Sequence, residues 1–104
     1  MDVAVVGNAM LNAAKNAAGD TWSKVQHDFA SDLGSVLRNA ANIEAKLVNG
    51  ELTEDEAEEL LREQSKILFV LSQEVALDAK LVVQNAVNAA IDALWTAVKA
   101  AAGG

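Results

Sequence analysis

Acidic side chains are concentrated in one short stretch of the chain, between residues 51 and 63. A single arginine, Arg62, is interspersed among seven carboxylates: Glu51, Glu54, Asp55, Glu56, Glu58, Glu59 and Glu63. One chemistry that suits such a cluster is weak binding of a divalent cation, but the Asp-x-Asp-x-Asp-Gly calcium loop is absent. The other is docking of a basic partner, for which the candidate residues are Glu54, Asp55, Glu58 and Glu59. We favour a third interpretation, in which carboxylates of a first helical turn complement the helix dipole.

The single histidine, His27, is the next residue that could do chemistry, with Asp28 and Asp32 close behind it in the sequence. Di-iron bundles need a histidine on each of two helices, and zinc sites with one histidine and no cysteine are atypical. We therefore interpret His27 as a helix-face residue paired with a carboxylate. The sequence predicts no metal site, no cofactor and no catalytic residue.

Four polar residues interrupt the apolar second half of the chain: Glu74, Asp78, Asn85 and Asn88. Buried carboxylates in a cleft can act as general acids or bases, but no nucleophile or glycine-rich phosphate loop accompanies these. Polar residues at core positions of helical bundles fix register and oligomeric state. We predict that role for them, and we expect that the protein is not an enzyme.

Composition narrows the class of protein further. The 104 residues include no cysteine and no proline, and the formal charge is −7. A disulfide framework is therefore ruled out, and nucleic acid is not expected as a partner. The length fits one helical domain over residues 1–104. No uncharged run of 18 residues occurs, so we predict no transmembrane helix and a cytoplasmic protein; export without a signal escapes this test.

Apolar residues recur at helical spacing in the first half of the chain. Steps of three or four residues separate Trp22, Val25, Phe29, Leu33, Val36, Ala40, Ile43 and Leu47. These steps average close to the ~3.6 residues of a helical turn, and no segment alternates as a strand would. The sequence therefore predicts an all-α fold. Gly7 and Gly34 fall inside the helical pattern, where we expect them to permit close helix packing.

The strongest break lies near the middle of the chain. Asn49-Gly50 suits a glycine C-cap, and Thr53 precedes Glu56 by the spacing of a capping box. A weaker break signal occurs at Gly19.

These breaks predict a long antiparallel helical hairpin with a helical arm at 3–48, a turn at 49–53 and a helical arm at 54–102. If the turn is centred there, residue i faces roughly residue 101 − i, which places Arg38 opposite Glu63.

The second arm is apolar around more of its circumference than the ~100° stripe of an ordinary surface helix. One partner helix cannot cover such a surface, and exposed apolar patches mark interfaces. We predict self-association into a four-helix or larger bundle, with a homodimer as the first expectation. The predicted interface residues are Leu68, Leu71, Val75, Val82, Ile91, Leu94 and Trp95.

A non-enzymatic helical interaction or structural protein fits these features best, one that self-associates and binds a protein partner. The alternative is an exported or membrane-active amphipathic helical protein. Basic residues are sparse and the turn is acidic, which argues against binding to an anionic membrane.

Overall fold

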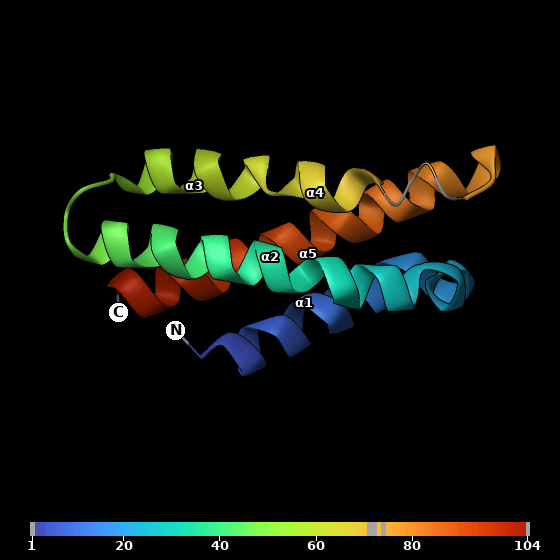
Figure 1. Cartoon of the computed structure of the whole chain (residues 1–104), viewed down its shortest axis with the longest axis horizontal. Helices are drawn as coiled ribbons and strands as arrows, with labels where there is room; N and C mark the ends of the chain where they lie inside the picture. The colour runs from blue at the N-terminus through green and yellow to red at the C-terminus, as the bar shows by residue number, and fades with distance from the viewer. Residues whose placement is uncertain (1, 71–72, 74, 104) are drawn as a thin grey trace.

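The computed structural model describes residues 2–70, 73 and 75–103, and the regular structure in this part of the chain is entirely helical. The helical segments are α1 (Val3–Ala18), the 3-10 turn η1 (Gly19–Thr21), α2 (Trp22–Val48), α3 (Glu54–Glu63), α4 (Ser65–Phe69) and α5 (Leu77–Gly103). Figure 1 shows them running along the longest axis of the molecule, with the chain reversing direction after α1, after α2 and after α4. The prediction of an all-α fold is confirmed.

Helix α2 forms around the apolar face that the spacing predicts. The central positions of that face are buried, from Val25 and Phe29 to Ile43, and Trp22 and Leu47 at its two ends are half-buried. The face continues along 27 residues because steps of three and four keep it on one side of the helix.

The reversal after α2 is built from local hydrogen bonds. Gly50 adopts a φ of 77°, the left-handed conformation that favours glycine. The amide of Glu51 donates to the carbonyl of Lys46 at 2.9 Å, and the amide of Gly50 donates to that of Leu47 at 3.2 Å. This is the paired hydrogen-bond pattern of a Schellman cap, and it satisfies carbonyls that the helix end leaves free.

The start of α3 is a capping box, as the sequence predicts. The Thr53 hydroxyl accepts from the amide of Glu56 at 3.2 Å, and the Glu56 carboxylate accepts from the amide of Thr53 at 3.0 Å. Two amide donors that lack partners in the helix are thereby satisfied.

The two glycines in the helical pattern differ. A Cβ added at Gly7 would lie 3.1 Å from the Leu37 side chain, so this buried glycine permits close packing of α1 on α2. A Cβ added at Gly34 would meet no atom within 4 Å. The packing interpretation therefore holds for Gly7 and is wrong for Gly34.

Neither predicted arm is one continuous helix. The first arm, 3–48, divides at η1, where the weaker break signal at Gly19 lies and the chain reverses (Figure 1). The second arm, 54–102, divides as well. Helix α3 ends at Glu63, α4 ends at Phe69, and α5 begins at Leu77. A continuous arm would extend ~75 Å, whereas the longest dimension of the molecule is 43 Å. Folding back lets α5 pack most extensively against α1, and also against α2. Figure 1 shows α5 returning along the molecule toward the N-terminal end of α1. Burial of apolar surface offsets the helical hydrogen bonds lost at the break.

Within the described part of the chain, side chains from each helix from α1 to α5 meet in one apolar core. The fully buried members include Met10 of α1, Phe29 of α2, Leu61 of α3, Leu68 of α4 and Leu94 of α5. The broad apolar circumference that suggested a second chain is therefore covered largely within a single chain.

Candidate functional site

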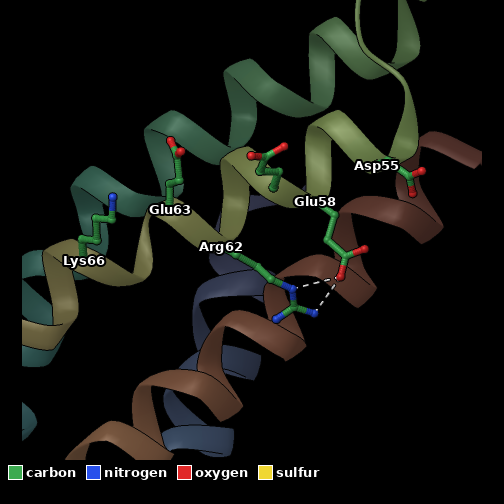
Figure 2. A pocket seen from close by; sticks show the side chains of 6 residues that line it. Asp55, Glu58, Arg62, Glu63 and Lys66 are labelled. Carbon is green, nitrogen blue, oxygen red and sulfur yellow. Dashed lines mark hydrogen bonds and ion pairs between the residues drawn. The ribbon is translucent and has the colours of Figure 1, made fainter.

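The predicted docking cluster lies on the outer surface of α3. Three of its members, Asp55, Glu58 and Glu59, help to line a shallow open depression of about 500 Å³, whereas Glu54 is exposed at the helix start and is not among the lining residues. Figure 2 shows this depression, which we call the acidic face; its described lining residues are Asp55, Glu58, Glu59, Arg62, Glu63 and Lys66. The helical spacing of these residues places them on one side of α3 and the start of α4.

Arg62 is the structural centre of the acidic face. Its Nε and Nη2 atoms lie 2.9 and 2.8 Å from Oε2 of Glu58, one turn earlier on α3. Its Nη1 donates to Oδ1 of Asp92 on α5 at 2.9 Å. Hydrogen bonds from Asp92 first, and from Glu58 second, raise the pKa of the Arg62 guanidinium. Arg62 therefore ties α3 to α5 and neutralises part of the local negative charge.

Glu56 has a structural role at the edge of this cluster. Hydrogen bonds from the Thr53 backbone and hydroxyl lower the pKa of the Glu56 carboxyl. Its charge stabilises the start of α3 through these hydrogen bonds. The other carboxylates that line the acidic face, those of Asp55, Glu59 and Glu63, are exposed to solvent.

A metal role for these carboxylates has no geometric support. No group of three or more histidine, cysteine, aspartate or glutamate side chains within the described residues is arranged to hold a metal ion. What the acidic face can do chemically is attract a cation, since four carboxylates line it against two basic groups.

A second surface feature lies where α5 begins. Leu77 is 83% exposed and Leu81, one turn later, is 66% exposed. Val70, just beyond α4, is 52% exposed. We call Val70, Leu77 and Leu81 the apolar end. Along the same side of α5 the later positions are polar and exposed, among them Asn88 and Asp92. The leucines of the apolar end are therefore an exception on a side of α5 that otherwise exposes polar residues.

The sequence contained a signal for the apolar end. Leu77 and Leu81 stand at i and i+4 on the stripe that continues through Gln84 and Asn88. Neither leucine is among the predicted interface residues. Only the path of α5 shows which part of its apolar surface other helices leave uncovered.

The predicted interface residues have different positions from those expected. Leu68, Ile91, Leu94 and Trp95 are buried within this chain, and Val75 and Val82 are half-buried. Leu71 lies outside the described residues. The buried four face the chain's own helices because α5 folds back onto α1, so these side chains are not available as a docking surface while the fold is closed.

Three of the four polar residues expected at core positions also need correction. Asp78, Asn85 and Asn88 are exposed, and Glu74 lies outside the described residues. The expected register pair of Arg38 and Glu63 does not form either. Arg38 instead donates to the Ser35 hydroxyl at 3.3 Å. The core positions were wrong because α5 folds back onto α1. The register pair was wrong by about two residues, because Asn39, and not Arg38, contacts the end of α3 at Gln64.

Cross-helix polar contacts occur elsewhere. The Asn39 amide donates to Oε1 of Gln64 at 2.7 Å, which links α2 to the junction of α3 and α4. His27 is exposed on the surface of α2, as predicted, but it forms no ion pair with a carboxylate among the residues that the structure describes.

Helix α5 has one further property. Over Leu77–Ala102 it is long and apolar enough to cross a membrane, judged by length and composition alone. The prediction of no transmembrane helix was based on the absence of an uncharged run, and α5 meets a less strict criterion. Burial in the core accounts for part of its apolar character, since Val83, Val87 and Val98 are also buried there.

No known protein family, curated protein or solved structure matches this chain. Its function is therefore inferred from its own residues and geometry.

Proposed function

We propose that this chain is a non-enzymatic interaction protein that self-associates through the apolar end and binds a protein partner. The observation that carries the proposal is the exposure of Leu77 and Leu81, at 83% and 66%, on the solvent side of α5. Large apolar side chains that neighbour one another in water are typical of association surfaces. Two of them one turn apart can pack against the same partner helix.

Sedimentation velocity tests self-association directly. We expect the wild-type chain to form dimers at tens of micromolar and the Leu77→Gln, Leu81→Gln double variant to sediment as a monomer. The matched control changes two exposed valines far from the apolar end, Val5→Gln and Val48→Gln, which are 62% and 57% exposed. It should remain dimeric. A wild-type chain that is monomeric throughout this range would contradict self-association.

The acidic face is the proposed site for the protein partner. Its exposed carboxylates favour a segment rich in lysine or arginine, and such surfaces act mainly on the rate and salt dependence of association. A binding partner captured from the source cell should lose affinity as salt rises. It should also lose affinity for the Glu59→Lys, Glu63→Lys variant and retain it for a reversal outside the face, Glu44→Lys. Equal binding to both variants would exclude the acidic face.

A second candidate function, action on membranes, is favoured by the length and composition of α5. It requires α5 to leave the core and enter lipid. Brominated phospholipids should then quench Trp95 in a Trp22→Phe variant. Trp95 is only 8% exposed in the closed fold, so strong quenching would require opening. Unquenched emission with both neutral and anionic vesicles would exclude this function.

A further inference from the structure

A groove lies between the second half of α1 and the first half of α2, far from the acidic face. Its volume is about 460 Å³, within the range of small-molecule sites. We call it the Trp22 groove. The described residues that line it are Leu11, Asn12, Lys15, Trp22, Gln26, His27 and Ala30.

The charge of the Trp22 groove is opposite to that of the chain. The formal net charge of the protein is −7, with 15 acidic and 8 basic residues. The ionisable side chains among the described lining residues are Lys15 and His27, and no carboxylate is among them. Neither of these two forms an ion pair in the described part of the chain. A single lysine facing a groove without a counter-charge favours an anion.

The helical geometry of α2 separates this groove from the nearby acids. Successive residues are rotated by about 100° around the helix, so Gln26 and Ala30 share one side of α2. Asp28 and Asp32 fall on the other side of its buried face. The acids of α2 therefore lie away from the groove, and its lysine comes from α1.

An aromatic surface is fixed inside the groove. Trp22 is half-buried, and its ring packs edge-to-face on Phe29 with centroids 5.3 Å apart and an interplanar angle of 63°. Phe29 is completely buried, so it anchors the indole from below. Trp22 therefore contributes to the lining an aromatic side chain that a second ring can contact.

From these features we infer that the Trp22 groove binds a small aromatic carboxylate. The ring of the ligand lies against Trp22 and Leu11, and the carboxylate lies at Lys15. Asn12 and Gln26 supply amide hydrogen bonds at the rim. Because the groove is open and the ligand is small, the dissociation constant should be on the order of 1 mM.

The test is titration of ¹⁵N-labelled protein with 1-naphthoate, observed by the indole N–H signals of the two tryptophans. The Trp22 signal should shift and saturate, while that of Trp95, which lies in the core, should stay in place. The uncharged 1-naphthamide has the same ring system without the carboxylate, and it should bind about tenfold more weakly.

Two pairs of variants locate the site. Ala30→Glu adds a carboxylate to the groove and should abolish the saturable shift, whereas the neighbouring Ser31→Glu makes the same change in charge outside it. Lys15→Gln should weaken binding about tenfold, and Lys46→Gln, near the far end of α2, should leave it unchanged. All four positions are exposed, and the amide spectrum of each variant reports its folding.

Three results would overturn the inference. The first is the absence of a saturable Trp22 shift with millimolar 1-naphthoate. The second is equal binding of 1-naphthoate and 1-naphthamide, which would make the groove an apolar contact without selectivity for anions. The third is equal binding to correctly folded Ala30→Glu and Ser31→Glu variants, which would place the ligand elsewhere.

Discussion

The reversal after α2 and the reversal after α4 turn the chain by different means. At the first, Gly50 adopts a positive φ, a Schellman cap closes α2, and a Thr53–Glu56 capping box opens α3. Residues 64–76, around the second, contain no glycine or proline. There the chain turns because α5 gains more by packing on α1 than by extending α4 into solvent. Local signals specify one reversal, and burial specifies the other.

Truncation of a core side chain gives the largest expected effect and tests the reversal after α4. Leu94 of α5 is fully buried, so Leu94→Ala should lower the free energy of unfolding by about 2–5 kcal/mol through lost transfer energy and a residual cavity. Leu81→Ala, on the exposed side of the same helix, should change it by less than about 0.5 kcal/mol. Urea titration measures both. Equal losses of unfolding free energy would mean that burial of α5 does not stabilise the reversal after α4.

Gly50→Ala tests the reversal after α2 and should have the next largest effect. The added Cβ would meet no atom within 4 Å, so the cost arises from the φ of 77° alone. We expect a loss of about 1–2 kcal/mol. Gly34→Ala is the control with the opposite sign, because an open position inside a helix should gain about 0.5–1 kcal/mol. If thermal unfolding showed a gain for both variants, the left-handed turn would not be required.

Thr53→Ala removes the cap of α3 and should cost about 0.5–2 kcal/mol. The double change Glu58→Gln, Glu59→Gln should cost no more than about 0.5 kcal/mol, since it weakens one exposed i,i+4 pair with Arg62. The two variants can be ranked in one urea series. The reverse order would show that the acidic face makes specific contacts beyond those of the helix start, which would strengthen its proposed docking role.

The smallest effect concerns pH. The pKa of Glu56 is lowered in the folded chain, so its ionised form contributes stability above the ordinary glutamate pKa of about 4.3. That contribution is lost as the pH falls through the lowered value. The stability difference between wild type and Glu56→Gln should therefore shrink between about pH 6 and about pH 3. A difference that is constant over this range would contradict the role of the ionised carboxylate.

The candidate sites were predictable from sequence to different degrees. The acidic face follows directly from the spacing of Asp55, Glu58, Glu59 and Glu63 along one helix. Its link to α5 does not, because Arg62 and Asp92, which form it, are 30 residues apart in the sequence and no local pattern pairs them. The exposure of the apolar end could not be predicted for a related reason: Leu77 and Leu81 are chemically the same as the leucines that are buried in the core.

Sequence by itself determined the all-helical class and the reversal after α2. Three signals act within a few residues of one another: the period of the apolar residues in α2, the glycine at position 50 and the Thr53–Glu56 spacing. Local sterics and hydrogen bonding are therefore sufficient for these signals to specify the structure. Tertiary structure alone decided where the second arm breaks and which apolar residues remain exposed. Both outcomes depend on the apolar area buried between α5 and α1, which lie at opposite ends of the chain. Because the hydrophobic effect is non-directional, a local sequence pattern does not specify which distant helix an apolar face will contact.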